Sequence, residues 1–125
     1  MSKKNIEAYI PKALAVLEEK FPLGEIPSSF NGYISSFGAS IVQSGLLPTL
    51  ALFENTNTST EENKEFLTYL IYRILTDTND DSSLLLYVLK NNTSKTKQEI
   101  LDISIAIKLS IRTFKKQLKR EGQNG

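Results

Sequence analysis

Apolar residues recur at intervals of three and four positions along most of the chain, and this spacing predicts helices rather than strands. The first such series forms one helix face and consists of Ile6, Ile10, Leu14, Leu17 and Phe21. Pro11 lies inside this series, so the helix is either kinked there or begins near there with Pro11 in its first turn. Pro22, Gly24 and Pro27 then predict a turn.

A second helix is predicted to begin after Ser28 or Ser29, since either side chain can cap it. Its buried stripe consists of Phe30, Ile34, Phe37 and Ile41. Small side chains around Gly38 and Ala39 make another side of this helix slim. Because Gly38 lowers helix stability by roughly 1 kcal/mol, we expect a neighbouring helix of the same chain to pack closely against it, with contacts between subunits as the less favoured use.

Gly45 is a candidate left-handed stop for the second helix. Pro48 can lie in the first turn of a short helix that ends near Glu54. After a polar loop, Ser59 and Glu62 match a capping box. The helix predicted behind them carries paired apolar residues, namely Phe66, Leu67, Leu70, Ile71, Ile74 and Leu75.

Two further helices complete the pattern. Asp80 or Asp81 is a candidate cap for a short apolar helix over residues 84–89, for which a buried strand is the alternative. Thr96 and Glu99 match a second capping box, and the apolar face behind them consists of Ile100, Ile103, Ile107, Ile111, Phe114 and Leu118. The predicted fold is all-α, a compact single-domain bundle of five or six helices over residues 1–125.

Length and composition agree with one globular domain. The 125 residues are 40% hydrophobic and 23% charged, which is typical of a globular protein rather than a disordered one. No apolar run reaches the roughly 18 residues of a membrane span, and the first residues lack a signal-peptide core. These features predict a cytoplasmic protein without a membrane partner.

The chain has no cysteine and no histidine, which excludes disulfides, thiolate chemistry and the usual zinc sites. Metal-assisted hydrolysis would rest on carboxylates alone, such as Asp77, Asp80 and Asp81. Acids are common at helix starts for capping and dipole reasons, and this explains their positions more simply. The sequence therefore predicts no catalytic residue, no metal and no cofactor.

Positive charge gathers in the last predicted helix. From Lys108 to Arg120 there are six lysine or arginine residues and no acid, although the net charge of the chain is only +1. We call the following five residues the basic stripe and regard them as candidate RNA-binding residues: Lys108, Arg112, Lys115, Lys116 and Lys119. Lys12 and Lys20 would widen it if the first helix packs alongside. The alternative is an ordinary solvated helix with cations near its C-terminus.

The tyrosines give no comparable indication of base stacking. Tyr33, Tyr69, Tyr72 and Tyr87 fall in or beside apolar stripes, so they are predicted to be core or boundary residues.

Two segments resemble one known family, the small subunit of the Cmr complex, the type III-B CRISPR effector (RAMP module). The first is FGASIVQSGLLPTLALFE, from Phe37 to Glu54, and it is similar to the central motif of the family. The second is TKQEILDISIAIKLSIRTFKK, from Thr96 to Lys116, and it is similar to the last helix. The family often has a tryptophan in that helix, whereas this chain has Ile111 near that position.

The resemblance implies a non-catalytic subunit acting in antiviral defence. Copies of such a subunit stack beside the backbone subunits that hold the guide RNA, and they line the groove in which target RNA pairs with the guide. The implied partners are other Cmr subunits including the backbone subunit, further copies of the chain, guide RNA and target RNA.

Three other readings remain as alternatives. The chain could be a helical protein–protein interaction module with no nucleic-acid role, or a carboxylate–metal nuclease using the three aspartates named above. A DNA-reading helix-turn-helix is the third, but the helix after Gly45 offers no side chains suited to reading base edges.

Overall fold

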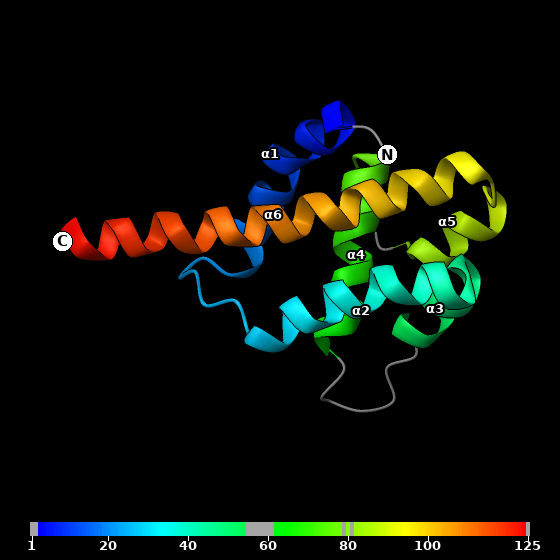
Figure 1. The fold of residues 1–125 in the computed structure, drawn as a ribbon, viewed down its shortest axis with the longest axis horizontal. Helices are drawn as coiled ribbons and strands as arrows, with labels where there is room; N and C mark the ends of the chain where they lie inside the picture. The colour runs from blue at the N-terminus through cyan, green and yellow to red at the C-terminus, as the bar shows by residue number, and fades with distance from the viewer. Residues whose placement is uncertain (1–2, 55–61, 79, 81, 125) are drawn as a thin grey trace.

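The computed structural model contains six helices and no strand in the part of the chain that it describes (Figure 1). It describes residues 3–54, 62–78, 80 and 82–124, with the side chains of 62–63 and 115–124 left out of the description. The helices are α1 (Lys3–Lys20), α2 (Ser28–Ser44), α3 (Leu46–Glu54), α4 (Glu62–Thr76), α5 (Leu84–Lys90) and α6 (Ser94–Asn124). The all-α prediction is confirmed.

Helix α6 is the element around which the others are arranged. Helix α1 packs mainly against α6, while α2 and α4 contact both α6 and each other. Helix α4 crosses α6 in Figure 1. The short helices α3 and α5 lie together at the end of the bundle near the start of α6. The apolar stripes predicted from the sequence meet in one core, whose largest fully buried side chains include Phe30, Phe37, Leu17, Leu50, Leu67 and Ile103.

Helix α1 continues through Pro11 from Lys3 onwards. Of the two alternatives, a helix that begins near Pro11 is therefore excluded, and Pro11 lies inside the helix. Its buried residues, Ile6, Ala13, Val16 and Leu17, provide the apolar face that packs against the rest of the bundle. At this interface the Ser110 hydroxyl of α6 donates to its own helix at the Ala106 carbonyl (2.7 Å) and lies 3.5 Å from the Ile10 carbonyl.

The corner between α2 and α3 has the positive φ that the glycine predicted, although its ψ lies outside the left-handed helical region. Gly45 has φ +98° and ψ 165°, and its amide donates to the Ile41 carbonyl at 3.0 Å. The buried Thr49 hydroxyl bonds the Gly45 carbonyl at 2.8 Å and shares a 2.7 Å hydrogen bond with Ser40. These bonds hold α3 at a set angle to α2, with Pro48 in the first turn of α3 as expected.

The predicted caps of α2 and α5 are wrong in identity, although both helices exist. Helix α2 begins at Ser28, after Pro27, without a side-chain cap. Ser83 caps α5, because its hydroxyl accepts from the Leu86 amide at 3.1 Å and directly precedes the first buried residue of that helix. Asp80 is instead held by the Tyr72 hydroxyl at 2.8 Å, so its carboxylate is not at the helix start.

The start of α6 is confirmed at Ser94, but the predicted capping box of Thr96 and Glu99 is not its cap. The Thr93 hydroxyl accepts from the Thr96 amide at 3.1 Å, so the cap lies three residues earlier. Two other predicted capping residues, Ser59 and Asp81, lie outside the described residues.

The expected packing of another helix against Gly38 is also wrong. A Cβ atom added at Gly38 would meet nothing within 4 Å, and the neighbouring Ala39 is exposed. The stripe of Phe30, Ile34, Phe37 and Ile41 turns the opposite side of α2 inward, which leaves the slim side facing outward. Among the described helices, none combines the length and the apolar character needed to cross a bilayer.

Candidate nucleic-acid interface

The candidate interface lies on the outward face of α6. Ile103, Ile107 and Ile111 are fully buried, and they place one side of the helix against α1, α2 and α4. Lys108 and Arg112 stand four residues apart on the opposite side, and both are exposed. A separation of four residues is about 6 Å along a helix axis, so the two charges are neighbours on one face.

These two cations are available for an external anion. Neither Lys108 nor Arg112 forms an ion pair with an acid among the side chains that the structure describes. The intervening Leu109 is 38% exposed, and the Thr113 hydroxyl donates a hydrogen bond to the Leu109 carbonyl at 3.2 Å. The described part of this face therefore carries positive charge without a compensating carboxylate.

Three members of the basic stripe lie further along the same helix. Lys115, Lys116 and Lys119 fall within the bounds of α6, but their side chains lie outside the description. The structure thus places Lys108 and Arg112 together and leaves the other three as sequence predictions.

Lys12 and Lys20 do not join this face. Both extend from α1 toward α4: the Lys12 ammonium lies 3.7 Å from the Asp77 carboxylate, and the Lys20 ammonium stands 5.4 Å from the centre of the Phe66 ring. Lys108 and Arg112 are exposed, and no ion pair or ring contact among the described side chains links them to α1 or α4. The suggestion that the first helix widens the basic stripe is therefore not supported by these contacts.

The tyrosines lie at the edge of the core, as the sequence predicted. Tyr72 is 6% exposed and its ring packs against that of Tyr87 at 6.3 Å, while Tyr33, Tyr69 and Tyr87 are partly buried. The Arg73 guanidinium lies 5.8 Å from the Tyr69 ring and bonds Glu19 at 2.7 Å, which ties α4 to α1. These rings serve packing between helices.

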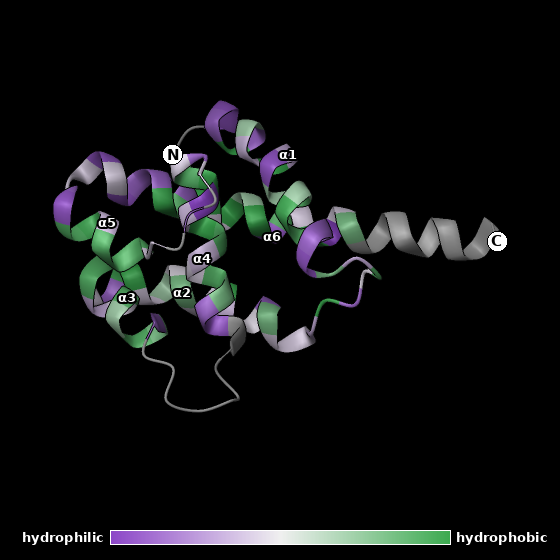
Figure 2. Ribbon diagram, turned by 180° about the vertical axis from the view of Figure 1, so that it is seen from behind, coloured by the Kyte–Doolittle hydropathy of each residue, from purple (hydrophilic) through white to green (hydrophobic). Residues whose placement is uncertain are grey.

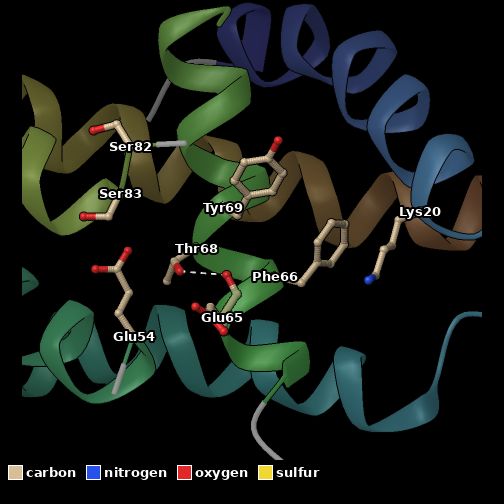
Figure 3. Close-up of a pocket in the computed structure, with 8 residues that line it drawn as sticks. All are labelled: Lys20, Glu54, Glu65, Phe66, Thr68, Tyr69, Ser82 and Ser83. Atoms are coloured by element: carbon tan, nitrogen blue, oxygen red, sulfur yellow. Dashed lines mark hydrogen bonds between the residues drawn. The ribbon is translucent and has the colours of Figure 1, made fainter. Parts of the chain in front are cut away.

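A separate pocket of about 550 Å³ opens between α3, α4 and the start of α5 (Figure 3). Glu54 at the end of α3 points across it toward Ser83, and its carboxylate accepts from the Leu85 amide at 3.3 Å. Burial raises the pKa of Glu54 above 4.5, helped by the nearby Glu65, although bonds from the Leu85 and Leu84 amides and Thr68 act in the other direction.

Sequence reasoning missed the role of Glu54, but the sequence holds a signal for it. An acid in the last turn of a helix is disfavoured by the helix dipole, so its presence there calls for a partner. Here the partner is the start of α5, where the Leu85 amide, 31 residues away, has no acceptor within its own helix and donates to the carboxylate. The pocket lies beside α4, apart from the outward face of α6, and its carboxylates do not suit a phosphate.

The aspartates of the alternative nuclease reading are engaged elsewhere. Asp77 pairs with Lys12, and Asp80 accepts from Tyr72 and from the Ser82 amide at 3.0 Å. These hydrogen bonds to the carboxylate lower the pKa of Asp80. Asp81 lies outside the described residues, and within them no three acids gather in a group that could hold a metal ion.

Comparison with known proteins gives one match, to a protein family. The sequence model of the family described as CRISPR-associated protein (Cas_Cmr5) matches residues 3–110, which is most of the chain. Neither the curated proteins nor the solved structures give a match. The matched residues extend from the first turn of α1 into α6 and end at residue 110, so they include Lys108 but not Arg112. The chain is therefore a member of the Cas_Cmr5 family, a small CRISPR-associated subunit of the type III-B Cmr complex.

Proposed function

We propose that this chain is a non-catalytic small subunit of the RNA-guided effector, acting in antiviral defence in the cytoplasm, and that α6 binds the backbone of target RNA. The observation that carries the RNA proposal is the pair Lys108 and Arg112, which are exposed on one face without an acidic partner among the described side chains. Membership of the family supplies the setting, a complex with other Cmr subunits.

The proposed contacts are electrostatic. Lysine and arginine side chains neutralise phosphates and release counterions, which gives affinity without sequence preference. Base pairing between guide and target supplies the recognition of sequence, as in other RNA-guided systems. The remaining residues of the basic stripe, Lys115, Lys116 and Lys119, continue the same helix and belong to this proposal by their position in the sequence.

The absence of a catalytic role is supported by the chemistry of the chain. Histidine and cysteine are missing from the whole sequence, so general base catalysis at neutral pH lacks its usual side chain. Asp77 and Asp80, the described members of the candidate carboxylate group, are already bound to Lys12 and Tyr72. We assign cleavage of target RNA to the backbone subunit, as the family resemblance implies.

We further propose that copies of the chain stack beside the backbone subunit. The outward side of α2 around Gly38 supports this, because it has no neighbour within 4 Å of the position of an added Cβ and small residues let backbones approach closely. This side of α2 is uncharged along its whole length, from Ser28 to Ser44.

The RNA proposal is tested by charge reversal in the assembled complex. Lys108→Glu with Arg112→Glu is expected to weaken capture of target RNA, and to reduce the slope of log affinity against log salt by about 0.7 for each lost phosphate contact. Adding Lys115→Glu should abolish capture. Both described side chains are exposed, so thermal unfolding of the isolated chain should remain unchanged.

Lys12→Glu with Lys20→Glu is the matched control, since it changes the charge equally on the side of α1 that faces α4. It should leave RNA capture intact. If the α6 variants capture RNA as well as the unaltered complex does, the chain is an interaction module without a nucleic-acid role.

A further inference from the structure

The end of the bundle formed by α3 and α5 exposes an unusual amount of leucine. Leu86 and Leu89 of α5 are 55% and 57% exposed, and Leu52 of α3 is 61% exposed. Neither Leu46–Phe53 nor Leu84–Leu89 contains a charged residue, and Figure 2 colours both helices as largely hydrophobic. Single exposed leucines are ordinary, but two on one turn of a seven-residue helix form an apolar face that the described chain leaves uncovered.

Helix α3, which carries the exposed Leu52, packs beside α5. The Glu54 carboxylate at the end of α3 meets the Leu85 amide at the start of α5, and Leu89 lies one helical turn beyond Leu85 on the same side. At the other end of the pair, a groove of about 420 Å³ is bounded by Leu46, Leu47 and Pro48 on α3 and by Asn92, Thr93, Ser94 and Lys97. Because α3 and α5 are in contact, we treat the exposed leucines of both helices and this groove together and call them the α3–α5 surface.

The rim of the α3–α5 surface is positively charged. Lys90, Lys95 and Lys97 are all exposed, and the stretch from Leu84 to Gln98 contains no acid. Lys95 and Lys97 lie in the first turn of α6. The helix dipole favours acids at this position, but the first turn of α6 contains none. Glu99 follows one turn after Lys95, but no ion pair joins any of the three lysines to an acid among the described side chains.

We propose that the α3–α5 surface docks a segment of a different protein subunit, one that carries apolar side chains flanked by acidic ones. The apolar side chains would cover Leu86 and Leu89, and the carboxylates would reach Lys97 at the edge of the groove and the exposed Lys95 two residues before it. This inference goes beyond the proposed function. It rests on membership of a multi-subunit complex and not on RNA binding by α6.

A second copy of the chain fits this surface less well. Its other large exposed apolar side chains, among the described residues, are Leu23, Val42 and Leu109. Leu109 stands between Lys108 and Arg112, which would repel the basic rim, and Val42 lies on the uncharged α2. Leu23 is a single leucine on the turn after α1, and of the nearby acids Glu18, Glu19 and Glu25 the second is already bonded to Arg73.

A polynucleotide also fits poorly, because it would satisfy the lysines and leave the leucines exposed to water. An acidic and apolar protein segment satisfies both, and pairs of this kind give specificity as well as faster association. The chemistry of the surface thus favours a protein over RNA.

The first test places a photo-crosslinking residue, p-benzoylphenylalanine, at Leu86 or at Leu89 in the assembled complex. The expected result is a cross-link to a different subunit, in a peptide that contains acidic and apolar residues, identified by mass spectrometry. Cross-links only to another copy of this chain, only to RNA, or to no partner in a complex that contains the chain would each overturn the proposal.

The second test measures binding of the full chain to the immobilised complex purified without it. Leu86→Gln with Leu89→Gln should weaken binding at least about tenfold, as expected for anchoring side chains at an interface. Lys95→Glu with Lys97→Glu should weaken it at least about fivefold and reduce its salt dependence. These side chains are exposed, so the thermal unfolding of each variant should match that of the unaltered chain.

Two controls separate this surface from the rest of the molecule. Leu23→Gln removes a leucine that is 80% exposed elsewhere, and Lys3→Glu with Lys4→Glu reverses two exposed charges at the start of α1. Both should bind within about twofold of the unaltered chain. Binding of the Leu86 and Leu89 double variant at the unaltered affinity would refute the inference, whereas loss of RNA capture by the α6 variants has no bearing on it.

Discussion

Replacing glycine by alanine is predicted to change the stability of the chain in opposite directions at Gly38, inside α2, and at Gly45, at the corner between α2 and α3. Gly45→Ala places a Cβ on a backbone with φ +98° and ψ 165°, a region that is essentially restricted to glycine. The added atom would lie 3.7 Å from Cδ of Pro48, an ordinary contact. The expected loss of folding free energy, about 1–3 kcal/mol, therefore comes from backbone strain alone.

Gly38→Ala is the matched partner. Gly38 lies inside α2, where alanine is more favourable than glycine by about 1 kcal/mol, and its added Cβ meets nothing within 4 Å. We expect this variant to be more stable than the unaltered chain by about that amount. The two alanine variants should thus differ by roughly 2–4 kcal/mol in free energy of unfolding.

The assay is urea unfolding of the isolated chain followed by circular dichroism, with thermal unfolding as a second measurement. At roughly 4 °C per kcal/mol for a domain of this size, Gly45→Ala should lower Tm by about 4–12 °C and Gly38→Ala should raise it by about 4 °C. An unchanged Gly45→Ala would mean that the corner does not need its positive φ. A destabilised Gly38→Ala would mean that α2 has a close neighbour on its slim side.

The remaining predictions concern Glu54 and Thr93. Because burial raises the pKa of Glu54 on folding, the folded chain binds this proton more tightly than the unfolded chain. The contribution of Glu54 to stability therefore falls as pH rises from the pKa of the unfolded chain through the higher pKa of the folded chain. Glu54→Gln should remove this fall. In urea unfolding, the free energy of unfolding of the variant should therefore rise relative to that of the unaltered chain between pH 4 and pH 7. An equal difference between the two chains at both pH values would contradict the assignment. Thr93→Ala should cost about 1 kcal/mol in thermal unfolding by removing the acceptor 3.1 Å from the Thr96 amide, and Ser94→Ala, one residue on, is its control.

The helices could be predicted from the sequence because their determinants are local. Apolar spacing located all six, and the short apolar stretch over residues 84–89 became α5 with one residue more. The Gly45 corner was predictable for the same reason, since few residues besides glycine adopt its φ.

Features that depend on contacts between distant segments were not predictable. Asp80 has the right residue type for a cap, but Tyr72 from the preceding helix holds its carboxylate. Gly38 has the composition of a packing surface, but the register of α2 turns it outward. Likewise Lys12 belongs with the basic residues by charge, whereas packing of α1 against α4 directs it toward Asp77. In each case the outcome depends on how the other elements pack, and helical spacing carries no information about that.

The pairing of the first and last helices has a consequence for synthesis on the ribosome. Ile10 and Ser110, which meet between α1 and α6, are 100 residues apart in sequence. At about 5–20 residues per second, α1 is complete roughly 5–20 s before that part of α6 exists. During this interval the apolar face of α1 lacks its main cover, so the nascent chain presents a target for chaperones that bind exposed hydrophobic segments. The core is therefore completed late in synthesis. The helix that completes it, α6, is also the one proposed to bind RNA.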